Sequence, residues 1–223
     1  MTREAFHARL DALGDHGASM CLMTRDLLEQ ATRSLLVADA SAADRVIAGG
    51  VELARQRAGT EEAVVQLLAL YAPVASDLRR VVSALWIVGD LHRMGVLAIH
   101  VAQATLRRHP AMVVPVALRA VFGRMGQVGA DLAGQTAVVL RDREVAAAAA
   151  LETRDDEMNL LRDRVFARVA DPSWRYGVTA GVDVALLGRC YERYTDHAVT
   201  IGRRVVYLVT GDTAAAERLG LRR

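Results

Sequence analysis

The sequence predicts an all-α protein made of two tandem antiparallel three-helix bundles related by a pseudo-two-fold internal repeat. Three observations support this fold class. Hydrophobic residues make up 52% of the chain but aromatic residues only 4%, and sheets normally need more aromatic and turn residues. Apolar residues recur at helical spacing over long stretches. The order of helices then repeats on either side of a proline-rich break, "RRHPAMVVP" at 107–115.

The first half is expected to contain three helices, over residues 6–35, 41–57 and 60–108. The segment "ADASAADRV" ends the first helix, and Ser41 is expected to cap the second. The segment "GTEE" at 59–62 has a hydroxyl followed by two acids, so Thr60 is expected to begin the third helix. Pro73 should perturb that helix, because proline removes a backbone donor.

The second half is expected to repeat this order, with helices over 116–141, 143–169 and from about 171 to 210. Asp171 can cap the last helix, with Pro172 at its first position. Gly211 is a natural residue to end it. The predicted domains are 1–109 and 116–211, followed by a tail at 212–223.

Weak sequence identity between the halves supports the internal repeat. With an offset of 100 residues, "LHRMGVLAIHVA" at 91–102 aligns with "YERYTDHAVTIG" at 191–202. Arg93 then matches Arg193, Ala98 matches Ala198, and Val82 matches Val182. Helix order, helix lengths and the central break agree with these matches, as an internal repeat requires.

Charge and composition exclude several classes of function. The chain has 28 basic and 26 acidic residues, and every basic residue apart from histidine is arginine. A net charge of +2 is not that of a nucleic-acid-binding protein, and no short basic recognition helix follows a glycine turn. Cys21 and Cys190 lack metal-site spacing and are expected to be small buried hydrophobes. The charged N-terminus is no signal peptide, and no apolar run is expected to span a membrane, so we expect a soluble protein.

The segment "ERYTDHA" at 192–198 contains the most informative side chains. Glu192 and Asp196 are four residues apart and therefore share one helix face. They continue the apolar stripe Val178, Val182 and Ala185, which is expected to face the bundle. Like charges at this spacing are unfavourable unless a cation lies between them.

Two kinds of cation fit this pair. Asp155 and Asn159, four apart on the preceding helix, can face the two acids and build an oxygen-rich metal site. Alternatively, Arg189 or Arg193 can form salt bridges with the acids. Spacing alone leaves both interpretations open.

Two longer segments resemble the repeat signatures of the PhoU family of phosphate transport regulators. These are "APVASDLRRVVSALWIVGDLHRMGVLAIHVA" at 72–102 and "ERYTDHAVTIGRRVVYLVTG" at 192–211. The family signatures read roughly P-x-A-x-D-L-R, then E-R-I-G-D-x-A, with a second copy E-R-x-x-D-H-A that ends in Y-L-x-x-G. The resemblance covers nearly the whole chain, including the helix count and the central break.

The resemblance implies a cytoplasmic adaptor that represses the phosphate-starvation response and phosphate uptake when phosphate is ample. Its implied partners are the phosphate transporter ATPase subunit, the sensor histidine kinase of the phosphate two-component system, and a second copy of itself in a homodimer. It would lie at the inner face of the membrane through these partners, without inserting and without binding nucleic acid.

The resemblance also implies a divalent or ferric metal cluster in some members, on one E/D-x-x-x-D motif per repeat. In the second repeat Asp155, Glu192 and Asp196 keep the implied ligands. In the first repeat His92 replaces the glutamate, Val96 replaces the aspartate, and Gly50 falls near the acid expected on the second helix. We therefore expect no metal in the first repeat.

The remaining expectations concern partner contacts and chemistry. Asp77 and Arg79 match the first signature and, with Arg93 and Arg193, are the expected partner-binding residues. No catalytic motif is visible, so no enzyme is expected. The alternative is a carboxylate-bridged metal enzyme, but that class needs Glu-x-x-His pairs on two helices, and this set is missing.

Overall fold

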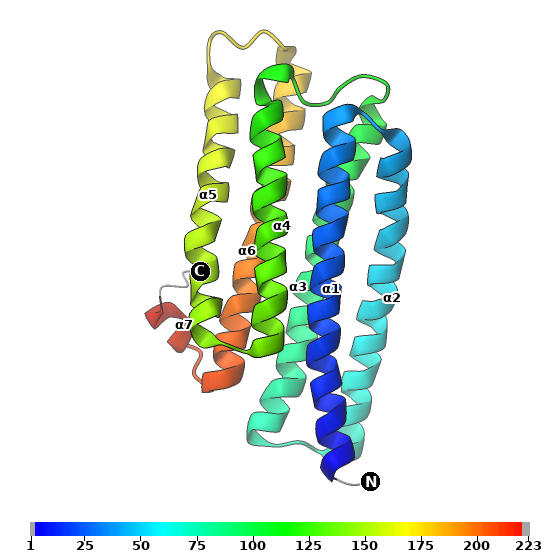
Figure 1. Ribbon diagram of the computed structural model, residues 1–223, viewed down its shortest axis with the longest axis vertical. Helices are drawn as coiled ribbons and strands as arrows, with labels where there is room; N and C mark the ends of the chain where they lie inside the picture. The colour runs from blue at the N-terminus through cyan, green and yellow to red at the C-terminus, as the bar shows by residue number, and fades with distance from the viewer. Residues whose placement is uncertain (1–2, 220–223) are drawn as a thin grey trace.

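The computed structural model describes residues 3–219 and confirms the all-α fold class (Figure 1). Six long helices form two three-helix bundles, and no strand occurs within the described range. The elements are α1 Arg3–Val37, α2 Ala40–Tyr71, α3 Ala75–Arg108, the 3-10 turn η1 Val116–Leu118, α4 Arg119–Asp142, α5 Val145–Ala170, α6 Gly177–Thr210 and the short α7 Ala215–Arg218.

The two bundles lie side by side with their long axes roughly parallel (Figure 1). Helix α1 packs on α4 and α3 packs on α6, while α2 and α5 form the outer edges. One continuous cluster of buried apolar side chains runs through both bundles, from Met20 and Leu28 in the first to Tyr191 and Tyr194 in the second. The proposed domain boundaries at 109 and 116 stay a prediction, but the halves share this core.

The central break passes over the top of the molecule in Figure 1. Val113, Val114 and Leu118 are buried there, so the linker packs on the bundles instead of hanging free. His109 Nδ1 lies 3.1 Å from the carbonyl oxygen of Ala38 in the α1–α2 turn. The linker is therefore anchored at both its apolar and its polar positions.

The predicted boundary between the second and third helices is wrong. Helix α2 runs through "GTEE" without a break, and the turn comes at 72–74, where Pro73 lies. Thr60 is buried and donates its hydroxyl to the Gln56 carbonyl at 3.0 Å, so it is no cap. The acids of this segment instead support the helix, since Glu61 pairs with Arg57 one turn away at 2.7 Å.

Two further helix starts differ from prediction, and one end agrees. Helix α2 is capped by Asp39, which accepts from the Ala42 amide at 2.9 Å, and Ser41 is not the cap. Helix α6 begins at Gly177 because Asp171 closes a local turn with the Ser173 amide at 2.7 Å. Gly211 ends α6 as predicted, with φ 75° and its amide bonded to the Tyr207 carbonyl at 2.8 Å.

The predicted buried stripe of the last helix is wrong in its phase. Val178 is 84% exposed and Val182 is 51% exposed. The bundle instead buries Val184 and Tyr191 on the neighbouring phase of the helix. Apolar residues occur on both of these faces of the helix. The apolar periodicity therefore fits a helix rotated by about one residue almost as well as the predicted one.

Helix α3 corrects the expectation that no segment could span a membrane. By length and composition α3 is apolar enough to cross one, and half of its most apolar window is buried inside the protein. It packs against α1, α2 and α6. The core helix of a soluble bundle has this same composition.

Candidate functional site

Glu192 lies on α6 in the α5–α6 interface, and its charge is met by two arginines. The residue is 6% exposed. One carboxylate oxygen accepts from Arg162 of α5 and the other from Arg189, one turn earlier on α6. Arginine is therefore the cation beside Glu192 in this structure. Such charge-assisted hydrogen bonds are the strong kind, and they satisfy a buried carboxylate.

Asp155 and Asp196 flank this ion pair but lack such partners. Asp155, on α5, is buried, and its Oδ2 accepts from Asn159 Nδ2 at 3.0 Å. Its other oxygen is buried without a hydrogen-bond partner among the described residues. Burial raises the pKa of Asp155, and the charge of Asp196 adds to this rise while neighbouring Thr195 and Asn159 oppose it.

Asp196 lies at the exposed rim of the same interface. Partial loss of solvent raises the pKa of Asp196, and the nearby Glu192 charge raises it further, against the opposing charge of Arg189. The structure therefore brings the three predicted acids to one interface. It assigns them different states: Glu192 paired, Asp155 half-satisfied and Asp196 at the rim.

The residues present do not fit a metal site in this arrangement. Both oxygens of Glu192 are engaged by guanidinium groups, which a metal would have to displace. Within residues 3–219, no group of three or more histidine, cysteine, aspartate or glutamate side chains has the geometry to hold an ion. The metal site expected from the sequence at Asp155, Glu192 and Asp196 is untested, and this arrangement favours the arginine interpretation of Glu192.

The corresponding place in the first repeat has no carboxylate cluster. His92 Nδ1 lies 3.4 Å from Arg57 Nη1. Burial lowers the pKa of His92 and the Arg57 charge lowers it further, which favours the neutral imidazole. A side chain at Gly50 would meet Ile99, whose Cδ1 would be 2.2 Å from the added Cβ. A side chain at Gly50 would therefore have to displace the end of the Ile99 side chain.

The predicted partner-binding residues divide into two places. Arg79, Arg93 and Arg193 lie on the α3–α6 pair, and Arg93 and Arg193 are exposed. The Nε of Arg79 donates to the Leu208 carbonyl at 3.5 Å, which joins the start of α3 to the end of α6. Asp77 instead faces α1, with its Oδ2 3.7 Å from His7 Nε2. Their role in partner binding stays a prediction.

A buried ion-pair network between the repeats was missed by sequence reasoning. Asp90 on α3 is 6% exposed. Its Oδ1 lies 3.1 Å from His197 Nδ1, and its Oδ2 accepts from Arg204 Nε at 2.7 Å. Burial would raise the pKa of Asp90, but the bonds from His197 and Arg204 outweigh it and hold the pKa below its usual value. The one signal was an aspartate inside an apolar stretch.

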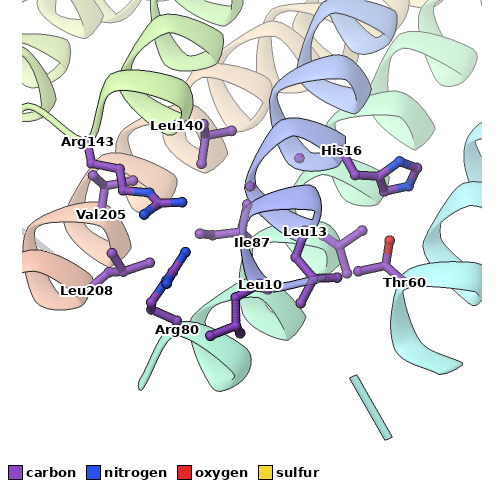
Figure 2. A pocket seen from close by; sticks show the side chains of 14 residues that line it. Leu10, Leu13, His16, Thr60, Arg80, Ile87, Leu140, Arg143, Val205 and Leu208 are labelled. Carbon is purple, nitrogen blue, oxygen red and sulfur yellow. The ribbon is translucent and has the colours of Figure 1, made fainter. Parts of the chain in front are cut away.

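A small cavity of about 40 Å³ lies where the lower parts of α1, α3, α4 and α6 meet. Figure 2 shows Arg80 and Arg143 reaching toward each other at its edge, with leucine, isoleucine and valine side chains around it. Asp11 pairs with Arg80 and lies 3.7 Å from Arg143. His16 and Thr60 turn to the Gln56 carbonyl. With room for only a few waters, this cavity is a packing feature of the bundle interface.

Two copies of one three-helix unit, packed through equivalent helices, define the class: a tandem helical-repeat protein. The PhoU domain model matches the chain twice, at residues 18–105 and 122–205. The two matches coincide with the two bundles. The chain belongs to the PhoU family.

Relatives agree with this assignment. The chain is 42% identical over 209 residues to the phosphate-specific transport system accessory protein PhoU homolog 1 of Mycobacterium leprae, which covers 94% of each chain. It is 41% identical to PhoU homolog 2 of Mycobacterium tuberculosis, over 94% of this chain and 98% of that one.

Solved structures show the same fold. The PhoU protein of Streptococcus pneumoniae superposes with a TM-score of 0.84 at 21% identity, over 93% of this chain and 98% of that chain. The PhoU protein of Pseudomonas aeruginosa gives 0.81 at 22% identity, over 93% and 100%. These structures show the shared fold, while the sequence relatives show that this chain belongs to a family of phosphate transport accessory proteins.

Proposed function

We propose that the protein is a negative regulator of the phosphate-starvation response and of phosphate uptake. In this proposal it is a cytoplasmic adaptor at the inner face of the membrane, between the phosphate transporter ATPase and the sensor histidine kinase. The observation that carries the proposal is the double PhoU match, together with relatives of about the same length named as phosphate transport accessory proteins.

The distribution of charge supports an adaptor. The buried acids Asp90 and Glu192 hold the helices together through arginines, while the exposed Arg93 and Arg193 are available to partners. We propose Arg79, Arg93 and Arg193, with Asp77, as contact residues. A homodimer is part of the same proposal.

Deletion of the gene tests this function. In cells grown with ample phosphate, we expect the deletion strain to express phosphate-uptake genes that the parent strain represses, and a plasmid copy should restore repression. Phosphate uptake should rise in parallel, with no enzymatic step lost. Normal repression in the deletion strain would contradict the proposal.

The alternative function, a carboxylate-bridged metal enzyme, has little support. The sequence contains one Glu-x-x-His spacing, Glu4 to His7 at the start of α1. His7 faces Asp77, and no second such pair occurs along the chain. That chemistry needs the pair on two helices, with further glutamates facing inward.

A further inference from the structure

A groove of about 340 Å³ lies on the seam between α3 and α6. Its walls come from the C-terminal half of α3, around Leu97, and the N-terminal half of α6, around Leu187. In Figure 1 these two helices pack behind α1 and α4 and run antiparallel. None of the residues that line the groove comes from α2 or α5.

The floor of the groove is apolar. Leu97 and Leu187 are buried at its base, and Leu186 is 60% exposed at its side. Cys190, half-buried, completes the floor. Apolar surface that remains open between two helices is the usual seat for the apolar face of a further helix.

The rim of the groove is basic. Three arginines line it, Arg107, Arg189 and Arg193, against one carboxylate, Asp183. Asp183 is already held by Arg108 at 2.7 Å, and Arg189 binds Glu192. Arg107 and Arg193 are exposed and form no salt bridge or side-chain hydrogen bond within residues 3–219. Two guanidinium groups are thus free to form the bidentate hydrogen bonds with a carboxylate that arginine favours.

The same chemistry continues along α3 beyond the groove. Arg93 lies one turn before Leu97, and Trp86 lies two turns before Arg93, so the three share one helix face. Trp86 is 43% exposed, and the Arg204 guanidinium stacks over its ring at 5.1 Å. Apolar and basic side chains therefore alternate along most of this seam.

We infer that the α3–α6 groove binds an acidic, amphipathic helical segment of a partner protein. The floor takes its apolar residues, and Arg107 and Arg193 take carboxylates on its flanks. A free phosphate ion would gain nothing from the apolar floor, and a membrane surface fits a convex patch better than a groove between two helices. The inference rests on the proposed adaptor function and assigns its contact surface.

Purified full-length protein tests the inference by direct binding. The probes are the transporter ATPase subunit and the cytoplasmic part of the sensor kinase from the same organism. We expect the double variant Arg107→Glu/Arg193→Glu to bind about tenfold more weakly or worse. The control Arg33→Glu/Arg164→Glu reverses two exposed arginines on α1 and α5 and should bind like the wild type. Wild-type binding should weaken as salt rises.

Cys190 supplies an independent readout at the groove itself. Cys21 is fully buried, and burial raises the pKa of its thiol to about 12. Burial also raises the pKa of the Cys190 thiol, but Cys190 is only partly buried, so it is the thiol that a maleimide reaches in the folded protein. A bound partner should slow the labelling of Cys190 several-fold, and the slowing should disappear in the double variant.

The possible outcomes separate the inference from the function on which it rests. The groove assignment would be overturned if the double variant bound the probes with wild-type affinity and a bound partner did not slow the labelling of Cys190. The adaptor function would then still stand. Failure of the wild type to bind either probe would overturn both. If the wild type bound vesicles of anionic lipid and the double variant did not, the groove would be assigned to a membrane instead. If the wild type were a dimer and the double variant a monomer, the groove would be assigned to a second copy of the chain.

Discussion

Glu192 illustrates how one side chain determines what the second repeat can bind. Arg162 comes from the neighbouring helix and Arg189 from the preceding turn. Together they supply two positive charges to a buried carboxylate, so a divalent ion there would compete with bonds already formed. Arg189 was one of the two arginines that the sequence indicated. Arg162 could not be predicted, because no local spacing relates it to Glu192.

The first prediction concerns this competition. We expect protein purified without chelator to contain no stoichiometric metal, and added Mn²⁺, Mg²⁺, Zn²⁺ or Fe to leave its melting temperature unchanged. Elemental analysis and thermal melts check this. A metal content near one site per chain that disappears in Asp196→Ala would contradict it and restore the metal interpretation of Asp155, Glu192 and Asp196.

Asp155 gives the second prediction. Its Oδ1 is buried without a described partner, and burial followed by the Asp196 charge raises its pKa. Asp155→Asn should therefore stabilise the protein at pH 7, by about 1 kcal/mol. Because the folded state binds the Asp155 proton more tightly than the unfolded state does, the wild type gains stability as pH falls through the raised pKa. The difference in unfolding free energy between Asp155→Asn and the wild type should therefore shrink at low pH. The exposed neighbour, Asp156→Asn, should change the unfolding free energy little.

For Asp90 we expect the opposite effect on stability, because its substitution should destabilise the protein. Its bonds to His197 and Arg204 outweigh burial and lower its pKa, so the ionised form stabilises the fold above the unfolded pKa of about 3.9. Asp90→Asn should destabilise the protein by about 2 kcal/mol at pH 7. The difference should be lost as pH falls below about 4, through the lowered pKa of the folded state. Denaturant melts between pH 3 and 7 check this, with the exposed Asp44→Asn as the control.

The ends of the helices show which local sequence signals predict helix boundaries correctly. Gly211 was predicted correctly because a left-handed C-cap needs a residue without a Cβ. The helix start predicted at "GTEE" was wrong because acids have two roles. After a hydroxyl residue they are typical of helix starts, but inside a helix they also form stabilising pairs such as Arg57–Glu61. Proline was the stronger signal, and the turn lies at Pro73.

Glycines along α3 and α6 carry a prediction about helix spacing. An added Cβ at Gly202 would lie 3.0 Å from the Ala148 carbonyl oxygen and 3.0 Å from Leu151 Cδ1, so α5 and α6 would have to separate. Gly202→Ala should lower stability by about 1–3 kcal/mol. Gly89 has nothing within 4 Å of an added Cβ, so Gly89→Ala should raise stability by about 0.5–1 kcal/mol through helix propensity. Loss of stability in both variants would contradict this account.

At the scale of the whole molecule, periodicity and the repeated helix order were sufficient to predict the fold class, whereas contacts between the halves were not predictable. The Asp90–His197–Arg204 network and the shared core around Met20 and Tyr194 join residues more than a hundred positions apart. Their partners are selected by how the bundles pack, which no local pattern records. The same packing forms the α3–α6 groove from residues that sequence spacing could not bring together.

Complementation of the deletion strain tests the central claim most directly, namely that this protein regulates phosphate uptake by binding partners through the α3–α6 face. A phosphate-uptake gene reporter is measured in ample phosphate, with the wild type, Arg33→Glu/Arg164→Glu or Arg107→Glu/Arg193→Glu supplied at equal abundance. We expect the wild type and the control to repress the reporter and the groove variant to leave it expressed. Full repression by the groove variant would contradict the account.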